Sequence, residues 1–409
     1  MSLFIPGLTS RQLPTLSNSK RRIKRAETPV LLADRQDYPT LSQTEYANRQ
    51  ILAMQNKKSQ KKSLALLIAA HNEEKVISHT IRSAVSAGLD KSDIFIVDDN
   101  SNDFTSRIAK KHLGKLNVVS VERSGKGLAL HKAAKIFRLT QRYDWIHIAD
   151  ADGGFDTKYF RILVRNLDPQ SAAATGYIRS LPGSMISKYR VYEYTLGMEI
   201  ARRFQAIAGV IPIIPGPTSC FRSDVFEKLN FADNMLTEDF DVTLQIHRQK
   251  LGTIQFIPEA VAYTQDPQTF KDFMHQINRW NRGVMQGIYK HGIGRKAGKI
   301  DAYLSYQIMQ NLMFFVLNFI WLPFLSITLQ NPAILGMGFL SDVILTFGMV
   351  MFAAGQTGRW DILKVFPFIY GLRWVNLLVF IRAFAEVSIL GKFRNDKGVW
   401  EGAKRAQLT

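Results

Sequence analysis

Trp145-Ile146-His147-Ile148-Ala149-Asp150-Ala151-Asp152 is the stretch of sequence that decides the fold. Its first five residues form a short, mostly apolar run, which is typical of a strand buried in a parallel sheet. Two carboxylates, one residue apart, follow the run directly. Ligands of open α/β sheets bind outside the carboxyl ends of the strands, so this stretch predicts a strand with chemistry at its end.

The chain before this strand alternates between short apolar runs and helical patterns. Three more strands are expected at residues 64–70, 94–97 and 117–121, and three helices at residues 72–87, 104–113 and 128–139. Strands that alternate with helices form βαβ units, in which the strands lie parallel and helices cover the sheet. The sequence therefore predicts an α/β fold with a twisted, mostly parallel sheet.

The character of the chain changes after about residue 300. No charged side chain occurs in residues 302–341, and a helix needs only about 20 apolar residues to cross a bilayer. Spans are expected at residues 303–329 and 333–354. A third apolar segment, residues 365–390, contains two arginines and a glutamate, which are costly in lipid. It either lies at the membrane surface or spans with its charges facing a cavity, and we favour the first because it keeps the basic tail in the cytoplasm.

Four segments follow from these patterns. We expect a basic arm at residues 1–62, a catalytic domain at 63–300, a membrane region of two to three helical segments at 301–391 and a basic tail at 392–409. The arm carries twelve Lys/Arg against four Asp/Glu. It is either a solvated arm or one that rests on anionic lipid.

The formal charge of +19 has two interpretations. A nucleic-acid-binding protein neutralises phosphates with Lys and Arg, whereas a membrane protein collects these residues on its cytoplasmic side. The apolar C-terminal third favours the membrane interpretation, and no nucleic-acid partner is expected. Cys220 is the single cysteine, so no intrachain disulfide can form, which fits a reducing compartment.

Three short motifs are weak functional candidates when each is taken alone. Asp150 and Asp152 could share one divalent cation, because Mg²⁺ and Mn²⁺ favour oxygen ligands and a substrate diphosphate, although such a pair is usually an ordinary loop. Asp98 and Asp99 end the second strand, where acids often serve as turn or cap residues. Lys126, between two glycines, could meet a phosphate or could be a solvated loop lysine.

Two further motifs belong to predicted helices. Thr237-Glu238-Asp239 precedes a helix, where acids are also normal for capping and dipole reasons. Gln276, Arg279 and Trp280 fall on one helical face at spacings i, i+3 and i+4. An amide, a guanidinium and an indole on one face could bind a sugar ring and a diphosphate. An amphipathic helix near a membrane would contain much the same residues.

The order of the motifs is more specific than any one of them. Along the chain come His71-Asn72-Glu73, Val97-Asp98-Asp99-Asn100-Ser101, Asp150-Ala151-Asp152, Thr237-Glu238-Asp239 and Gln276-Ile277-Asn278-Arg279-Trp280. This order, followed by membrane segments, resembles family 2 glycosyltransferases with a GT-A fold. The resemblance is strongest to the membrane-bound processive branch with the cellulose, chitin, hyaluronan and poly-N-acetylglucosamine synthases. It covers about residues 63 to 290 and extends more loosely over the membrane part.

The resemblance implies a role for each motif. Residues that would hold the nucleotide base and ribose are Ala70, His71, Glu73 and Asp99. Residues that would meet the donor diphosphate are Lys126, Asp150 and Asp152, and the two aspartates would also hold Mg²⁺ or Mn²⁺, Asp152 the more directly. Asp239 would be the general base. Residues that would close over the diphosphate and shape the acceptor channel are Glu238, Gln276, Arg279 and Trp280. Residues 216–221 match the stretch that borders the acceptor site.

The chain departs from the family pattern at His71-Asn72, which follow two alanines. Relatives often have proline, threonine and tyrosine in this stretch, so the contacts to the nucleotide base are less defined.

The resemblance also implies a reaction. One base and no enzyme nucleophile mean a single displacement, so an α-linked donor would yield a β-linkage. The metal and Arg279 would stabilise charge on the leaving phosphate, and Asp239 would take the acceptor proton. The expected partners are a nucleotide sugar, UDP-linked, a glycan or lipid-linked acceptor, membrane lipid and accessory export proteins.

The expected location is the cell membrane, as a multi-pass protein whose catalytic domain faces the cytoplasm, where nucleotide sugars are made. Two alternatives stay open. A non-processive transferase could modify a lipid or a single acceptor, although Gln-x-x-Arg-Trp favours chain extension. A basic nucleic-acid-binding membrane protein would leave the ordered acidic motifs unexplained.

Overall fold

The strand that carries Asp150 lies in the middle of a mixed sheet. The computed structural model describes residues 62–181, 183–231 and 235–392, which belong to one compact unit of the chain, residues 58–409. Within the described residues one sheet has the strand order β3-β2-β1-β4-β7-β6-β8-β5. The expected basic arm and basic tail lie outside the described residues, except for Lys62 and Lys392 at their borders.

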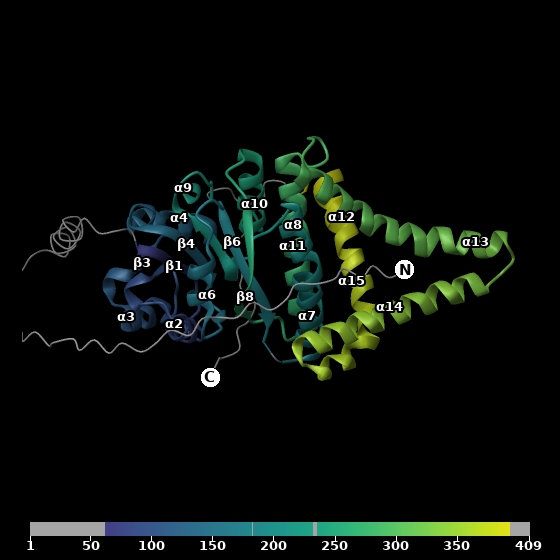
Figure 1. The fold of residues 1–409 in the computed structure, drawn as a ribbon, viewed down its shortest axis with the longest axis horizontal. Coiled ribbons are helices and arrows are strands. Elements are labelled where there is room, and N and C mark those ends of the chain that lie inside the picture. The colour runs from purple at the N-terminus through teal and green to yellow at the C-terminus, as the bar shows by residue number, and fades with distance from the viewer. Residues whose placement is uncertain (1–61, 182, 232–234, 393–409) are drawn as a thin grey trace, which may run out of the picture. The chain divides into compact units, whose positions relative to one another are not determined.

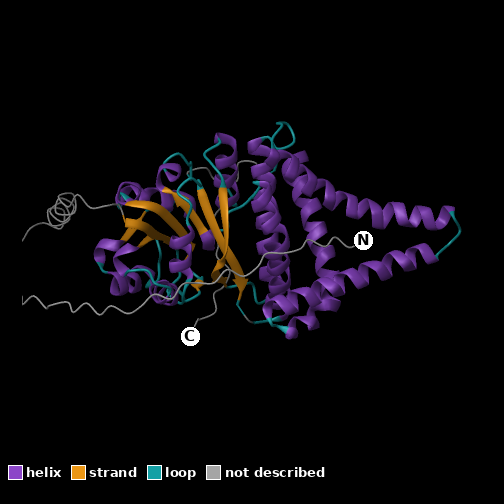
Figure 2. Cartoon of the chain, in the orientation of Figure 1, coloured by secondary structure: helices purple, strands orange, loops and turns teal. Residues whose placement is uncertain are grey.

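The strands and the sheet-covering helices follow each other along the chain (Figures 1 and 2). The strands are β1 (Lys62–Ala70), β2 (Ile94–Asp99), β3 (Val118–Val121), β4 (Tyr143–Asp150), β5 (Gly154–Phe155), β6 (Ala173–Ser180), β7 (Ser219–Arg222) and β8 (Ile254–Thr264). The helices are α2 (Ile77–Ser86), α3 (Thr105–Leu113), α4 (Lys126–Ile136), α5 (Leu139–Arg142), α6 (Tyr159–Asn166), α7 (Met185–Leu196), α8 (Arg203–Ala208), α9 (Ser223–Phe226), α10 (Glu238–Gln249) and α11 (Phe270–His291). A π-helical turn, η3 (Gly197–Arg202), joins α7 to α8, and the short 3₁₀ turns are η1 (Lys91–Asp93), η2 (Lys115–Asn117) and η4 (Gly216–Thr218).

The parallel half of the sheet confirms the predicted fold class. Strands β3, β2, β1 and β4 are parallel, and the register places Ala69 beside Asp150 and Ala70 beside Asp98. The acidic strand ends therefore meet at one edge of the sheet. The other half was not predicted: β7 pairs antiparallel with both β4 and β6, and β5 pairs antiparallel with β8.

The core lies on both faces of the parallel strands. Along β1 the side chains of Leu64, Leu66 and Ile68 pack on one face, and those of Ala65 and Leu67 pack on the other. Helices α2, α3 and α6 cover the first face, while α4, α5, α9 and α10 cover the second. A strand buried on both faces is apolar throughout, which is why periodicity identified β1 correctly.

The first helix begins later than the sequence pattern suggested. The expected helix at residues 72–87 starts only at Ile77, because Asn72 has a left-handed backbone with φ of 56°. The Asn72 backbone N–H donates to Ser101 Oγ at 2.9 Å, and its side-chain oxygen accepts from the Asn102 N–H at 2.8 Å. Residues 71–76 are thus a turn bonded to the loop after β2.

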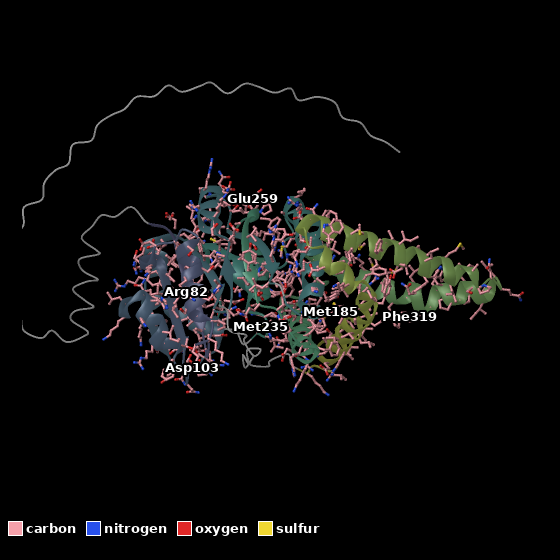
Figure 3. All side chains as sticks on the ribbon, turned by 90° about the horizontal axis from the view of Figure 1, so that it is seen from below. Arg82, Asp103, Met185, Met235, Glu259 and Phe319 are labelled. Carbon is pink, nitrogen blue, oxygen red and sulfur yellow. The ribbon has the colours of Figure 1, made fainter. Side chains whose placement is uncertain are left out.

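Three apolar helical segments follow the sheet. They are α12, η5 and α13 (Lys299–Val316, Leu317–Trp321, Leu322–Thr328), then α14 (Ala333–Thr357), then η6, α15 and η7 (Trp360–Val365, Phe366–Phe384, Ala385–Ile389). Each is long and apolar enough to cross a membrane. The first two form a hairpin, and Figure 3 shows mostly carbon along the hairpin around Phe319, whereas nitrogen and oxygen are concentrated over the sheet.

The third apolar segment has a different position from the other two. In Figure 1, α15 runs across the base of the hairpin and lies beside α7 and α11. Its buried stripe, which includes Ile369, Leu372 and Val379, packs with Tyr189 of α7 and Phe273 of α11.

The two arginines and the glutamate of α15 and η7 are paired. Arg373 bonds Asp342 of α14 at 3.1 Å, and Glu386 bonds Arg282 of α11 at 2.8 Å and Arg382 at 2.8 Å. Paired charges of this kind lower the cost of placing the segment next to lipid.

Helices α10 and α11 approach each other closely at Gly287. A Cβ at this position would lie 2.5 Å and 2.6 Å from two ring carbons of the buried Phe240. Although alanine favours a helix by up to about 1 kcal/mol, overpacking a rigid contact costs about 1–3 kcal/mol. We therefore expect Gly287→Ala to lower the thermal unfolding temperature of the detergent-solubilised protein.

Gly371→Ala on α15 is the matched control, since a Cβ there has no neighbour within 4 Å. The control should unfold at or slightly above the wild-type temperature. If Gly287→Ala unfolded at the same temperature as Gly371→Ala, the close contact between α10 and α11 would be wrong.

Candidate functional site

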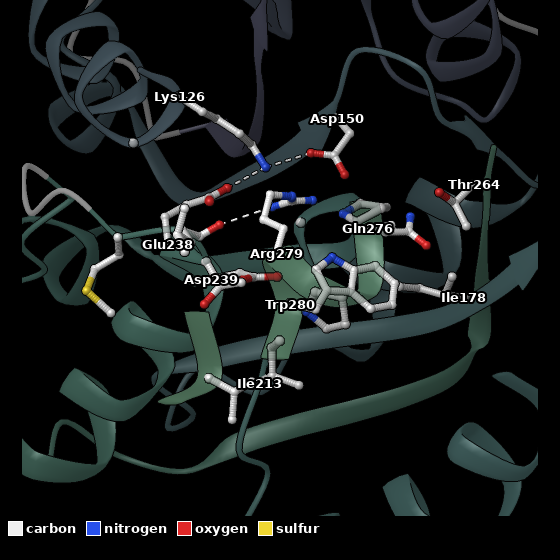
Figure 4. Close-up of a pocket in the computed structure, with 18 of the residues that line it drawn as sticks. Lys126, Asp150, Ile178, Ile213, Glu238, Asp239, Thr264, Gln276, Arg279 and Trp280 are labelled. Atoms are coloured by element: carbon white, nitrogen blue, oxygen red, sulfur yellow. Dashed lines mark hydrogen bonds and ion pairs between the residues drawn. The ribbon is translucent and has the colours of Figure 1, made fainter. Parts of the chain in front are cut away.

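A pocket of about 430 Å³ opens at the carboxyl edge of the parallel strands. Its walls come from the start of α4, the end of β4, the start of α10 and one face of α11 (Figure 4). The residues from the predicted motifs that line it are Lys126, Asp150, Asp152, Glu238, Asp239, Gln276, Arg279 and Trp280. Motifs up to about 150 residues apart in the chain thus converge on one cavity.

Lys126 is the central cation of this pocket. Its Nζ lies 2.7 Å from Asp150 Oδ1 and 2.6 Å from Glu238 Oε1, and its side chain is 14% exposed. Burial acts to lower the pKa of Lys126, but the two carboxylates outweigh burial and raise that pKa well above its usual range. Lys126 therefore stays charged at neutral pH and ties α4, β4 and α10 together.

Two glycines make the position of Lys126 possible. Gly125, directly before α4, has φ of 84°, a left-handed conformation that side chains rarely adopt. A Cβ on Gly216 would lie 2.9 Å from Asp150 Oδ1 and 3.1 Å from Lys126 Nζ. The backbone after residue 215 can therefore pass close to the ion pair only as glycine.

Asp239 stands in the first turn of α10 and lines the pocket. Burial and the neighbouring Glu238 raise its pKa, Lys126 and Arg279 lower it, and the result is a pKa of about 6. A carboxylate with this pKa is deprotonated at neutral pH and still basic enough to accept a proton from a reacting group. The geometry therefore fits the expected general base.

The predicted face of α11 does line the pocket. Gln276, Arg279 and Trp280 all border it, and Arg279 Nη1 donates to the Leu236 carbonyl at 3.0 Å. This bond holds the guanidinium beside the loop that leads into α10. In Figure 4 the Arg279 and Trp280 side chains lie next to Asp239.

The sequence patterns did not indicate Arg190, which lies outside the pocket lining and contacts Gln276 and Trp280 of this face. The buried Arg190 of α7 donates through Nη2 to Gln276 Oε1 at 2.6 Å, and its guanidinium lies 4.8 Å from the Trp280 ring centre. A guanidinium only donates, so the Gln276 carbonyl must face Arg190, and the amide N–H₂ is left to face elsewhere. No pattern in the sequence around Arg190 indicates that it contacts Gln276.

A second buried cluster joins α10 to α11. Asp241 accepts from His291 Nε2 at 2.7 Å and from Gln245 Nε2 at 2.8 Å, and it pairs with Lys290 at 2.9 Å. Burial raises the pKa of Asp241, but these hydrogen bonds outweigh burial and hold it below its usual range. The cluster positions the start of α10, two residues from Asp239, against α11.

The residues expected to hold the nucleotide lie beside the pocket rather than on its lining. They are Ala70, His71, Glu73 and Asp99. Asp99 accepts from the backbone N–H groups of Ser124 and Gly125 at 2.8 Å and 3.0 Å, and its own carbonyl bonds His71 Nδ1 at 2.9 Å. Asp99 thus holds the loop that presents Lys126. Asp98 accepts from the Ser101 N–H at 3.0 Å and supports the loop after β2.

Asp150 and Asp152 are the carboxylates that could hold a divalent cation in this pocket. Among residues 62–181, 183–231 and 235–392, no three His, Cys, Asp or Glu side chains converge to hold a metal by themselves. Asp150 and Asp152 both line the pocket, and Mg²⁺ is commonly held by one or two carboxylates together with substrate phosphates and water. Two carboxylates therefore fit an ion that binds together with a diphosphate.

Comparison with known proteins gives three findings. Residues 61–283 match the family model described as "Glycosyltransferase like family 2". The chain is 26% identical over 288 residues to a poly-beta-1,6-N-acetyl-D-glucosamine synthase of Staphylococcus epidermidis, covering 68% of each chain. It is 27% identical over 250 residues to the synthase of the same name from Staphylococcus aureus (strain COL), covering 58% of this chain and 60% of that protein.

Among solved structures, the chain superposes on the mannosyltransferase PcManGT from Pyrobaculum calidifontis, in complex with GDP-Man and Mn²⁺. The TM-score is 0.48 at 16% identity, over 85% of this chain and 95% of that chain.

Proposed function

The chain belongs to glycosyltransferase-like family 2, and from this premise we propose that it is an inverting transferase that uses a nucleotide sugar. The donor is a UDP-linked hexose or N-acetylhexosamine, and the acceptor is the hydroxyl of a growing glycan or of a lipid-linked glycan. The names of the synthases that it resembles support a processive reaction that forms β-linkages.

One observation carries the proposal. Two strand-end carboxylates, a basic carboxylate and an amide–guanidinium–indole face converge on one pocket around Lys126. The pocket combines cations for a diphosphate, a base for a hydroxyl and an aromatic surface for a sugar ring. Neither a lone acidic pair nor an amphipathic helix would bring these three chemistries together.

The reaction follows from the placement of these groups. The acceptor oxygen forms a bond to the anomeric carbon while the bond from that carbon to the diphosphate oxygen breaks. Asp239 takes the proton of the acceptor hydroxyl, and the nucleoside diphosphate leaves. One displacement inverts the anomeric configuration, so an α-linked donor yields a β-linkage.

The leaving diphosphate needs positive charge. Arg279 and Lys126 supply it from the protein, and both are held by neighbours before the donor binds. A divalent cation, held by Asp150 and Asp152, would add charge stabilisation when bound. Trp280 and Gln276 form the side of the pocket on which the acceptor sugar rests.

We further propose that the chain crosses the membrane twice. The hairpin of α12, η5, α13 and α14 spans, while α15 lies at the membrane surface between the hairpin and the catalytic domain. The packing of α15 against α7 and α11 supports this arrangement, as do the exposed Arg382 and Lys364 near its ends. The catalytic domain and the C-terminal tail then share the cytoplasmic side.

The transfer itself is tested with the detergent-solubilised full chain and a panel of nucleotide sugars. With Mg²⁺ or Mn²⁺ present, release of nucleoside diphosphate is expected from a UDP-linked hexose or N-acetylhexosamine. Excess chelator should abolish the release, because Lys126 and Arg279 alone do not replace the charge that the cation supplies to the leaving diphosphate. If no sugar nucleotide in the panel were hydrolysed or transferred, the proposal would fail.

The role of Asp239 is tested by substitution and by pH. Asp239→Asn should reduce transfer by about 10²–10⁴-fold, because the base is lost while the donor contacts remain. In the wild type, the rate should fall as the pH drops through about 6, where the Asp239 carboxylate becomes protonated, and should level off above it. Asp224→Asn, in an exposed ion pair with Arg222, is the control and should leave the pH profile unchanged. Near-normal turnover by folded Asp239→Asn would exclude it as the base.

The topology is tested with single cysteines in a Cys220→Ser background. A cysteine at Thr409, in the tail, should resist a membrane-impermeant thiol reagent in intact cells and react after permeabilisation. A cysteine at Gln330, in the turn between α13 and α14, should react in intact cells and is the positive control. Labelling of the Thr409 cysteine in intact cells would place the tail outside and make α15 a third span.

A further inference from the structure

Arg202 is a buried cation in the pocket that the proposed reaction does not use. It ends the π-helical turn η3, lines the pocket and is 6% exposed. Its Nη1 donates to the backbone carbonyl of Ile213. Within residues 62–181, 183–231 and 235–392, Arg202 forms no ion pair with an Asp or Glu side chain.

The other two cations of the pocket differ from Arg202 in this respect. Lys126 contacts two carboxylates, and Arg279 lies close enough to Asp239 to lower its pKa. Burial lowers the pKa of Arg202 to about 10, and Tyr303 acts to raise it. Arg202 is therefore still protonated at neutral pH, and a buried guanidinium without a counter-charge is costly unless an anion binds to it.

The place of Arg202 in the pocket separates it from the donor groups. In Figure 4, Ile213, whose carbonyl Arg202 bonds, lies on the opposite side of Asp239 and Arg279 from Lys126. Ile213 and Val284 of α11 both line the pocket and pack against the same apolar cluster, so apolar side chains lie beside the carbonyl that Arg202 bonds.

The same region adjoins the membrane hairpin. Gln205, one helical turn after Arg202, donates to the Tyr303 hydroxyl at 2.7 Å, and Tyr303 stands near the start of α12. The Phe204 ring lies 6.4 Å from the Tyr303 ring. Arg202 is thus on the wall of the pocket that continues into the first apolar helix.

We propose that Arg202 forms a subsite for an oxyanion of the phosphate class, carried by an amphiphilic acceptor that enters from the membrane side. Nη1 bonds the Ile213 carbonyl, while Nε and Nη2 have no acceptor among the described residues. These two N–H groups form one edge of the guanidinium, and such an edge binds phosphate oxygens in pairs. The π-turn that carries Arg202 is a helix irregularity of a kind often found at functional sites.

This assignment rests on the proposed transferase function and names the acceptor class. The donor diphosphate has its own cations in Lys126 and Arg279, so a second anion site on the other side of Asp239 suits the acceptor. The base then stands between the two anion sites, where the acceptor hydroxyl must meet the anomeric carbon. An apolar lining beside a phosphate fits a lipid-linked glycan better than a free polysaccharide.

The experiment uses dodecyl phosphate as the probe and dodecyl maltoside, an uncharged amphiphile with the same chain, as its match. Binding of dodecyl phosphate to the full-length protein in dodecyl maltoside is measured by thermal shift across a titration. Wild type should be stabilised, Arg202→Met should bind about tenfold more weakly or worse, and Arg202→Lys should fall between them. Arg203→Met is the control, because Arg203 is half exposed and already paired with Glu199 at 2.9 Å.

UDP binding shows whether Arg202→Met is folded and which side of the pocket Arg202 serves. UDP affinity should be unchanged in Arg202→Met. If it fell by the same factor as dodecyl phosphate affinity, Arg202 would belong to the donor site and the proposal would be overturned. Equal dodecyl phosphate binding by wild type and Arg202→Met would overturn it as well.

A titration with inorganic phosphate separates the sources of the anion. Binding that is much weaker than that of dodecyl phosphate, but still lost in Arg202→Met, supports an amphiphilic acceptor. Equally strong binding would overturn the membrane-borne acceptor while leaving an oxyanion subsite. Release of nucleoside diphosphate by the wild type is measured separately. If the protein binds dodecyl phosphate through Arg202 but consumes no nucleotide sugar, the transferase function is disproved while the anion site stands.

Discussion

The ammonium of Lys126 between the carboxylates of Asp150 and Glu238 is the interaction on which the site depends. It joins the start of α4, the end of β4 and the start of α10. Without the cation, two carboxylates would face each other in a partly buried space, and like charges in such a space repel strongly. Gly216 leaves the room that this arrangement needs, and Gly125 supplies the left-handed backbone directly before α4.

The same electrostatic arrangement sets the basicity of Asp239. Its carboxylate is half-buried, and its pKa is raised by burial and by Glu238 and lowered by Lys126 and Arg279. The pKa of about 6 is therefore a balance of opposing neighbours, and a change at Lys126 would alter the pKa of Asp239, the proposed base, as well as the proposed contact to the diphosphate. An incoming diphosphate would compete with Asp150 and Glu238 for the ammonium, so donor binding and the state of the base are physically linked.

A chain of buried polar contacts connects this centre to the apolar helices. Asp241 fastens α10 to His291 and Lys290 of α11, and Arg282 of α11 pairs with Glu386 of η7. Arg248 of α10 forms two hydrogen bonds of 2.6 Å and 2.7 Å to Asp301 at the start of α12. The helix that carries Asp239 is thus held against the apolar helices from two directions, which favours a fixed position of the pocket relative to these helices.

The motif residues on α10 and α11 became specific only through the order of all the motifs along the chain, whereas local pattern alone indicated the parallel strands, the acidic strand ends and the apolar segments. These features have a short-range cause: a strand buried on both faces must be apolar, and a span must be about 20 residues long. Strands β6, β7 and β8 depend on pairing between distant segments, such as the antiparallel pair of Ala173 with Phe221 and the parallel pair of Ala173 with Ile254, and no local period indicates that pairing. The same reason hid Arg190, whose partner Gln276 is 86 residues away, and Arg202, whose importance lies in the absence of a described acidic partner. The position of α15 across the hairpin was also decided by packing, because its composition fits a span and a surface helix equally well. A sequence records which side chains are available. Their burial and the distances between them exist only after the chain has folded, and these set the pKa values and decide which charges are paired.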